Sequence, residues 1–263
     1  VGTDLQLISP RPWAIPTGVR RETVVLSITQ QVNDIVARAV GLHPERFAGI
    51  AALPQAAGTD AKFCVDELER CVSELGFVGL KITPDPTEGA GETPRMGDEY
   101  WYPLYERMVA LGVPALLRGG PFRFSREPEL GYFLGEEAVA AWSILRTPRV
   151  FEDFPALKIV VGHGGGYIPY QAGRGRAFRP NAMRNDPSLE SFDDSMRRLY
   201  YDTVLYDQDA MDLLVKVVGV DHCLFGSDKP ANGSVHDPAT GRALNDLRPL
   251  VEAVPGLTDA DRA

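Results

Sequence analysis

Short apolar runs recur along the chain, and segments with helical spacing or long loops separate them. Runs of this length, ended by polar residues, glycine or proline, predict short buried strands. The seven predicted strands are Asp4–Ser9, Phe47–Leu53, Phe77–Ile82, Val113–Leu117, Leu157–Val161, Leu199–Leu205 and Cys223–Phe225.

Segments with helical spacing lie between many of these strands. In the first of them, Glu22–Leu42, one stripe is formed by Val25, Ile28, Val32, Ile35 and Val36. The other predicted helices are Ala61–Leu75, Asp98–Leu111, Glu136–Ile144, Met211–Val218 and Leu257–Ala263. Because no hairpin turn signal separates the strands, the pattern indicates an α/β protein with a parallel sheet.

Polar residues recur directly after the predicted strands. They are Arg11, Lys81, Arg118, His163, Asp202 and Asp228. Long loops in the same places favour a (β/α)8 barrel, whose active site lies where the strands end. The count is one strand short of eight. Without an internal repeat or a linker, residues 1–263 are predicted to form a single domain.

His163 is one of only four histidines and stands between a predicted strand and Gly164–Gly166. The glycines allow a tight turn that places this side chain where the strands end. A histidine in this position is either a core residue beside a flexible turn or a functional residue. The other polar strand ends favour the functional interpretation.

Composition narrows the choice of partners. The net charge is −9 and no basic run is present, which argues against nucleic acid or an anionic membrane as a partner. No apolar run approaches about 20 residues, so the sequence predicts no membrane span. Cys64, Cys71 and Cys223 are odd in number and lie in apolar segments, as reduced cysteines of a cytoplasmic protein do.

Several segments together resemble the amidohydrolase-2 branch of the amidohydrolase superfamily. They are GFVGLKITPDP (76–86), WYPLYERMVALGVPALL (101–117), FPALKIVVGHGGGYIPYQAGR (154–174), LYYDTVLYD (199–207) and CLFGSDKP (223–230), and they cover nearly the whole chain. The family consists of metal-dependent barrels that include non-oxidative decarboxylases and 4-oxalomesaconate hydratases. DLQLISPR (4–11), ALPQ (52–55) and GSVHDPATGR (233–242) are similar to segments of the hydratases.

The resemblance implies one divalent metal, usually zinc. Its ligands in the family are a His-x-His pair on the first strand, a histidine after the fifth strand and an acidic residue after the eighth. Asp228 matches the acidic residue, and His163 matches a catalytic histidine that lies beside the metal. Zinc in such a site activates a water molecule. Asp228 could instead cap a helix or form a salt bridge in a loop.

Two parts of the family's ligand pattern are missing. No His-x-His occurs in the sequence, and the first predicted strand corresponds to the family's second, so we expect the chain to be a piece of a longer protein. Arg118 stands where the family has its fifth-strand histidine, and a guanidinium cannot ligate a cation. Arg118 therefore binds a substrate carboxylate, or pairs with Asp228 in a degenerate site, or another residue replaces it as ligand.

The remaining predicted contacts are with substrate. Arg11 and Lys81 are placed to bind carboxylates, although Arg11 could be a solvated arginine and Lys81 could pair with Asp85. Tyr132, or Phe133 next to it, matches a pocket tyrosine of the hydratases. Asp202 either orients a neighbour or caps a turn, and His236 lies in the hydratase-like tail.

We therefore expect a lyase that adds water to an unsaturated di- or tricarboxylate in the catabolism of aromatic compounds. A decarboxylase or hydrolase of the same family uses the same residues and is the alternative. A homologue that has lost its metal site and does not catalyse is the third hypothesis. The expected partner is a small-molecule carboxylate, and a homo-oligomer stays open.

Overall fold

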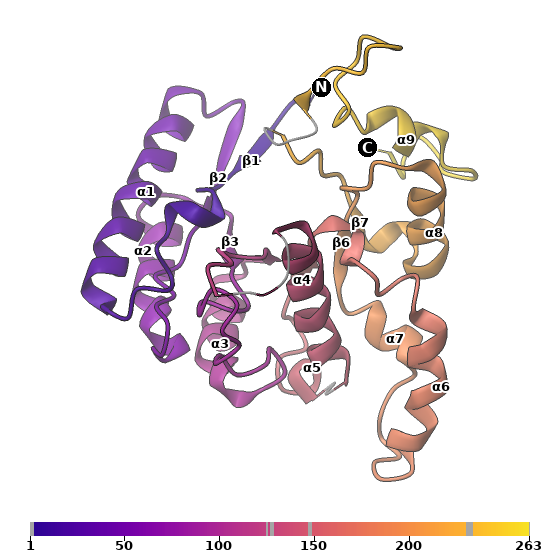
Figure 1. Ribbon diagram of the computed structural model, residues 1–263, viewed down its shortest axis with the longest axis horizontal. Helices are drawn as coiled ribbons and strands as arrows, with labels where there is room; N and C mark the ends of the chain where they lie inside the picture. The colour runs from indigo at the N-terminus through magenta and orange to yellow at the C-terminus, as the bar shows by residue number, and fades with distance from the viewer. Residues whose placement is uncertain (1–2, 125, 127–128, 147–148, 230–233, 263) are drawn as a thin grey trace. The chain divides into compact units, whose positions relative to one another are not determined.

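The computed structural model describes residues 3–124, 126, 129–146, 149–229 and 234–262, and the chain divides into two compact units. Residues 2–160 form the N-terminal unit and residues 161–263 the C-terminal unit. The boundary falls inside strand β5 (Ile159–Val161). Figure 1 shows the elements of each unit, and each unit is described by itself.

The N-terminal unit is built on parallel strands. β1 (Gln6–Ile8), β2 (Phe47–Ala51), β3 (Gly79–Ile82) and β4 (Ala115–Leu117) pair in chain order. Leu80, Ile82, Ala115 and Leu117 share one face and are fully buried, and Lys81 on the other face is 4% exposed, as expected of parallel strands that are covered on both faces.

Helices follow the strands of this unit. They are η1 (Pro12–Ala14), α1 (Glu22–Leu42), η2 (Ala61–Cys64), α2 (Val65–Ser73), η3 (Glu99–Trp101), α3 (Tyr102–Leu111), α4 (Glu129–Arg146) and α5 (Arg149–Asp153). Asp60 and Asp98 cap η2 and η3 by accepting a backbone N–H. Gly112 ends α3 in the left-handed conformation at φ 68°.

The buried face of α1 differs from the predicted stripe. Its buried residues are Val25, Thr29, Asn33 and Val36, whereas Ile35 is 64% exposed. Asn33 can be buried because its amide donates to and accepts from the backbone of Ala52, which follows β2.

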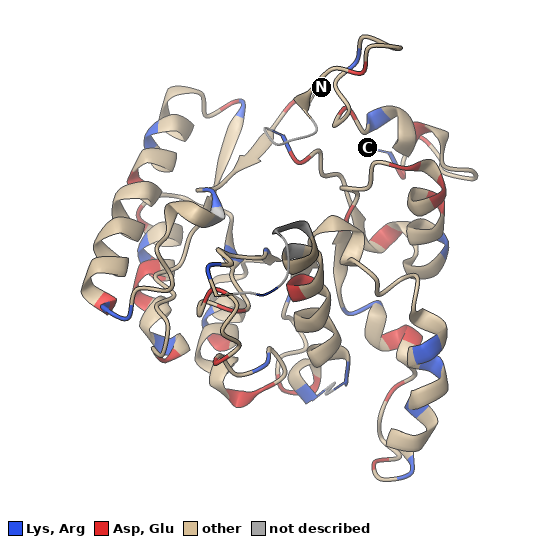
Figure 2. Ribbon diagram, viewed as in Figure 1, with Lys and Arg blue, Asp and Glu red and all other residues tan. Residues whose placement is uncertain are grey.

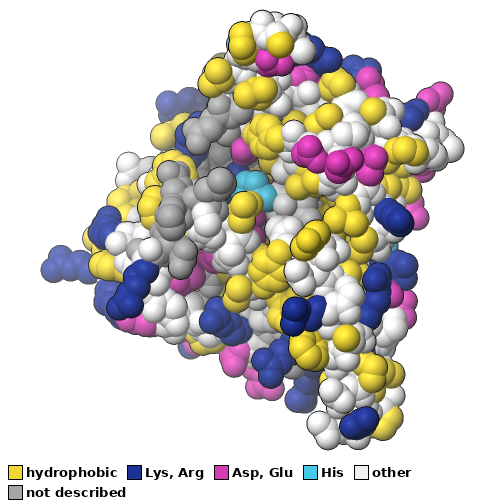
Figure 3. Space-filling model, turned by 45° about the vertical axis from the view of Figure 1, so that its right-hand side comes forward, with side chains coloured by type: hydrophobic (Ala, Val, Ile, Leu, Met, Phe, Trp, Pro, Cys, Tyr) yellow, Lys and Arg dark blue, Asp and Glu magenta, His cyan; other side chains and the backbone are white. Residues whose placement is uncertain are grey.

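The C-terminal unit pairs β6 (Tyr200–Asp202) in parallel with β7 (Cys223–Leu224). Its helices are η4 (His163–Gly165), α6 (Ala172–Met183), α7 (Phe192–Met196), α8 (Gln208–Val218), η5 (Val220–His222) and α9 (Arg248–Ala253). Ser191 and Asp207 cap α7 and α8. α6 packs on α7 and carries basic residues (Figure 2). Exposed hydrophobic side chains of this unit include Tyr167, Tyr170 and Phe178. Figure 3 shows hydrophobic side chains in yellow among the surface atoms.

All seven predicted strands are confirmed, each shortened at one or both ends. The helix predicted over Leu257–Ala263 is wrong within the described residues, which form turns there. Thr258 and Asp261 bond to each other in that segment, and such local side-chain bonds compete with a helix. Among the described residues, no helix has the length and apolar character needed to cross a membrane.

Candidate active site

The predicted site residues are divided between the two units. Arg11, Lys81, Arg118 and Tyr132 belong to the N-terminal unit, and His163, Asp202 and Asp228 to the C-terminal unit. Their roles stay predictions, as does the pairing of Arg118 with Asp228 across the unit boundary. The structure shows which groups each of these residues contacts within its own unit.

Lys81 and Arg118 lie on one face of the sheet in the N-terminal unit. Lys81 of β3 is paired with Leu116 of β4, and Arg118 follows Leu116 by two residues. Because side chains alternate along a strand, Lys81, Leu116 and Arg118 face the same side. The Arg118 N–H donates to Ile82 O at 3.0 Å, which extends the ladder to this position.

The Lys81 ammonium group is buried among these strands. Its side chain is 4% exposed, and Nζ donates to the carbonyl of Pro10, which follows β1, at 2.5 Å. Burial, and next the charge of Arg118, lowers the pKa of Lys81 to about 7. The predicted pairing of Lys81 with Asp85 is not among the salt bridges of the described residues. Arg11, beside Pro10, is exposed.

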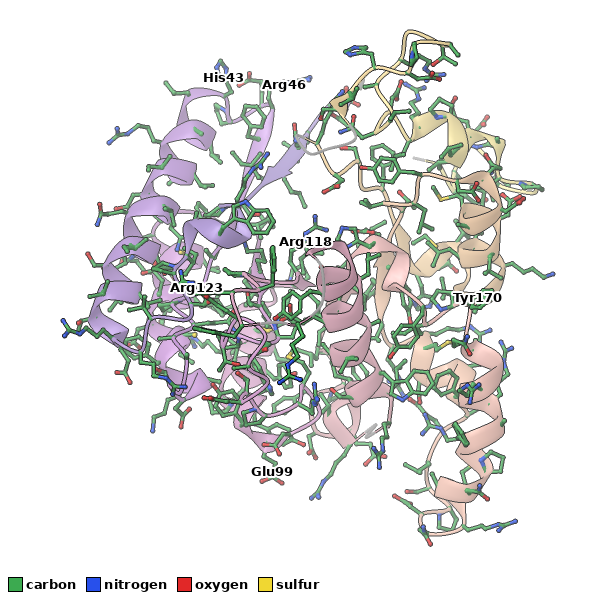
Figure 4. The ribbon with its side chains drawn as sticks, in the orientation of Figure 1. His43, Arg46, Glu99, Arg118, Arg123 and Tyr170 are labelled. Atoms are coloured by element: carbon green, nitrogen blue, oxygen red, sulfur yellow. The ribbon has the colours of Figure 1, made fainter. Side chains whose placement is uncertain are left out.

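Two adjacent carboxylates of α4 hold the segment that carries Arg118. Arg118 is labelled in Figure 4. Glu137 is fully buried and accepts the Gly119 N–H at 2.8 Å, and Glu136 accepts the Gly120 N–H at 3.2 Å. Glu136 also accepts the Asp85 N–H at 2.6 Å. Burial raises the pKa of Glu136 to about 8, although its two backbone donors favour the charged form. These carboxylates fix the backbone on the carboxyl side of β3 and β4.

Asp85 organises the loop after β3. Its carboxylate accepts the N–H groups of Thr87, Gly89 and Gly91 at 3.0 to 3.2 Å. The Tyr132 hydroxyl donates to the same carboxylate at 3.5 Å, and burial raises the pKa of Tyr132. Tyr132 is thus anchored over this loop, where the hydratases were expected to have a pocket tyrosine. The side chain of Phe133 lies outside the described residues.

His163 occupies a strained turn in the C-terminal unit. Its φ is 51°, a left-handed conformation that is uncommon for residues other than glycine. The next N–H, that of Gly164, donates to Asp202 Oδ1 at 3.0 Å, and the same oxygen accepts the Val204 N–H at 3.1 Å. Asp202 of β6 therefore holds the backbone of the turn that carries His163.

Glycine is needed in this turn for space as well as conformation. A Cβ on Gly164 would lie 2.8 Å from the Leu205 side chain, and one on Gly165 would lie 2.6 Å from the Tyr201 ring. Both glycines also have positive φ. The HGGG run therefore places His163 against the end of β6, which packs against η4.

Asp228 is also in the left-handed conformation, at φ 52°. It lies after β7, is half-buried, and accepts the Tyr206 hydroxyl at 3.3 Å. His236, in the predicted tail, is exposed and forms a bridge to Ala243.

The donor set for a metal is incomplete in the part of the chain that the structure describes. No group of three or more His, Cys, Asp or Glu side chains there could hold a metal ion. At the strand end where the family pattern has a histidine, Arg118 offers a charge and no lone pair. The described residues therefore do not fit a closed metal site.

Sequence reasoning missed the residues that support the site. Glu136 and Glu137 fall in a segment without a motif, and Gln55 lies in the ALPQ segment but was not chosen as a site residue. All three bond backbone groups near the strand ends. Gln55 accepts the Thr83 N–H and donates to Thr83 O, each at 2.8 Å. The one available signal was the Glu-Glu pair inside an otherwise apolar helix.

Comparisons with known proteins agree on the family of this chain. Residues 2–263 match the amidohydrolase family model (Amidohydro_2). The 2-keto-4-carboxy-3-hexenedioate hydratase of Sphingobium sp. is 36% identical over 99% of this chain and 75% of its own length.

Solved structures of hydratases and decarboxylases are also similar to this chain. The crystal structure of 4-oxalomesaconate hydratase from Rhodopseudomonas palustris has a TM-score of 0.85 and 34% identity, over 99% of this chain and 73% of that one. A dihydroxybenzoic acid decarboxylase from Polaromonas sp., solved with bound manganese and the inhibitor 2-nitroresorcinol, has a TM-score of 0.72 and 25% identity, over 95% and 75%.

Proposed function

Because this chain belongs to the amidohydrolase family and has its barrel-type α/β fold, as the sequence segments predicted, we propose that it is a hydratase of that family. Its substrate is an unsaturated di- or tricarboxylate from the breakdown of aromatic compounds. The hydratase from Sphingobium sp. supports this proposal through its 36% identity over 99% of this chain. We also propose that residues 1–263 form one barrel domain, since the family match extends through both units.

The observation that carries the proposal is a set of cationic side chains at the strand ends of the N-terminal unit. Lys81 and Arg118 share one face of the sheet, and the Lys81 ammonium reaches the residue next to Arg11. A substrate with several carboxylates needs such a set, because each carboxylate must exchange hydration for charged donors. The guanidinium groups of Arg11 and Arg118 can bind carboxylates in bidentate fashion, and Lys81 supplies a point charge.

The C-terminal unit supplies proton chemistry in this proposal. Addition of water to a carbon–carbon double bond requires an acid that protonates the carbanionic carbon. We assign this role to His163, which Asp202 holds through the adjacent amide. Asp228 is assigned to the activation of water, and Tyr206 orients it through its hydroxyl.

Zinc is the metal we propose, on the family pattern, with Asp228 as the ligand of that pattern that the described residues retain. The relative from Polaromonas sp. holds manganese. A divalent metal would supply an activated water molecule in such a site. Because the described residues do not complete a ligand set, the steps above are assigned to side chains of this chain alone. A cytoplasmic location is proposed from the three free cysteines.

Decarboxylation is the second candidate, favoured by the match to the Polaromonas decarboxylase. In a decarboxylation by this chain, His163 would protonate the ring carbon as CO2 leaves. Both reactions need the same acid, so the substrate decides between them.

The test is a direct assay with 2-keto-4-carboxy-3-hexenedioate, monitored by loss of the absorbance of its conjugated double bond. A parallel assay follows CO2 release from 2,6-dihydroxybenzoate. His163→Ala should lower kcat by about 100- to 10,000-fold, the usual contribution of an acid or base. His43→Ala, which removes an exposed histidine, should leave kcat unchanged. If both substrates stay unreacted in the presence of zinc or manganese, the chain is a non-catalytic homologue.

A further inference from the structure

Among the described residues, Lys81 is a buried amine without a carboxylate partner. Its side chain is 4% exposed, and the Pro10 carbonyl is its one hydrogen-bond acceptor in the part of the chain that the structure describes. A buried ammonium group that lacks a counter-ion loses its hydration without compensation, so the neutral amine is favoured. The hydrogen bond to Pro10 meanwhile fixes the nitrogen in place.

The surroundings of Lys81 are those that make a lysine nucleophilic. Lysines are activated by burial in an apolar site or by a second cation nearby, and both conditions hold here. The Lys81 side chain is 4% exposed, and its face of the sheet also carries the apolar Leu116 and the cationic Arg118. With a pKa of about 7, about half of the Lys81 side chains carry a free lone pair at neutral pH.

The position of Arg118 favours a 2-oxo acid as the compound that reacts with Lys81. A 2-oxo acid has a carboxylate directly bonded to its carbonyl carbon. A guanidinium that binds the carboxylate therefore places the carbonyl carbon close to a group on the same face. Lys81 lies on that face, and the charge of Arg118 acts on its ammonium group.

We propose that Lys81 forms an imine with the 2-oxo group of an oxo acid whose carboxylate Arg118 binds. The Nζ lone pair attacks the carbonyl carbon, and a proton moves from nitrogen to oxygen to give a carbinolamine. Loss of hydroxide, which takes up a proton and leaves as water, gives the protonated imine. Hydrolysis reverses each step, so no oxidant or reductant is required.

This inference rests on the proposed function, because a hydratase substrate with a 2-oxo group conjugated to the double bond would benefit from the imine. The protonated imine withdraws electrons from the double bond more strongly than the ketone does. Water then adds more readily to the far carbon, and the positive charge of the imine accepts the electrons. Lys81 thereby supplies electrophilic activation from within the N-terminal unit.

The test is reductive trapping with pyruvate, a 2-oxo acid that has no double bond to hydrate. The protein is incubated with pyruvate and sodium cyanoborohydride at pH 7, and peptide mass spectrometry follows the lysine that acquires one reduced pyruvyl group. Free amine at Lys81 exceeds that of a lysine with the ordinary pKa of about 10.4 by about a thousandfold at this pH. We expect initial labelling at Lys81 to be at least about tenfold faster than at Lys62, allowing for burial.

Two variants make the result specific. Lys81→Arg retains a positive charge and cannot condense, so it should lose the fast labelling. Lys62→Arg, at a side chain that is 73% exposed, should retain it. Circular dichroism and urea unfolding of both variants show whether they fold. If Lys81 is labelled no faster than the exposed lysines in the folded wild-type protein, the proposal is wrong.

The outcomes separate this inference from the proposed function. Hydration without trapping at Lys81 overturns the imine and leaves the hydratase. Trapping at Lys81 without hydration supports the imine and overturns the hydratase. Trapping and hydration that are both lost in Lys81→Arg support the two together.

Discussion

Asp202 offers a sharp test of how the turn before α6 is held. One carboxylate oxygen accepts the N–H groups of Gly164 and Val204, at 3.0 and 3.1 Å, and the side chain is 8% exposed. Both donor residues are buried. Asp202→Ala would leave two buried backbone amides without their acceptor, and each such loss costs about 1–3 kcal/mol. Partial relaxation makes about 2–4 kcal/mol the expected total. Asp202→Asn retains an acceptor oxygen and should cost only about 1 kcal/mol.

Hydrogen exchange is the assay that locates the effect. The three tryptophans, Trp13, Trp101 and Trp142, all lie in the N-terminal unit, so their fluorescence does not report on the C-terminal one. Exchange measured by mass spectrometry on peptides that contain Gly164 should accelerate by roughly 30- to 1,000-fold in Asp202→Ala, the equivalent of the expected free energy.

Asp237→Ala is the matched control. Asp237 likewise accepts two bonds, from the Ala239 N–H and the Thr240 hydroxyl, at 2.9 Å each. These donors are exposed, so water can replace the carboxylate and the cost should stay below about 1 kcal/mol. Equal effects of Asp202→Ala and Asp237→Ala on exchange near Gly164 would refute the reasoning.

Further predictions concern stability and its dependence on pH. Asn33→Ala should destabilise the protein by about 2–4 kcal/mol in urea unfolding, because the buried N–H and carbonyl of Ala52 lose their partner. Gly165→Ala should cost about 1–3 kcal/mol by the same measurement, since its φ is 77° and its Cβ would meet Tyr201. The pKa of Glu136 is raised to about 8, so the unfolded chain loses this proton first and the group destabilises the fold increasingly from about pH 4.3 to 8. Glu136→Gln should therefore lose less stability than wild type between pH 5 and 8, and an unchanged slope would contradict the raised pKa.

Strands such as β3 could be predicted from the sequence because burial on both faces leaves an apolar run. β1 and β7 were predicted from the same kind of run, although Leu7 and Leu224 are 58% and 44% exposed. The buried face of α1 could not be predicted in this way. The pattern of its apolar residues placed Ile35 inside, but the structure buries Thr29 and Asn33 instead. Asn33 is buried because the backbone of Ala52, 19 residues away, satisfies its amide. A hydrogen bond between residues so far apart in sequence leaves no trace in local periodicity. Sequence patterns therefore cannot predict which face of the helix such a bond buries.

The candidate site also contains residues that the sequence could predict and residues that it could not. Positions directly after strands, such as His163, could be identified because the topology alone brings strand ends together. The groups that hold those positions could not, because their partners are distant in sequence: Glu137 bonds Gly119 from 18 residues away, and Asp202 bonds Gly164 from 38. Their contribution depends on three-dimensional proximity, whereas the contribution of His163 depends on its own chemistry.

Backbone strain points independently to part of the predicted site. Among the described residues, the non-glycine residues with positive φ are Glu88, His163 and Asp228, and the last two were chosen from sequence alone. Such conformations cost about 1–3 kcal/mol each and persist only where surrounding contacts impose them. Asp202 and Tyr206 make those contacts at His163 and Asp228. Stability alone would favour glycine at both positions, which is consistent with the proposed roles of the His163 imidazole and the Asp228 carboxylate. Glu88 follows the same logic structurally: its buried carboxylate accepts the Gly18 N–H at 2.8 Å, which accounts for its strain without a role in the reaction.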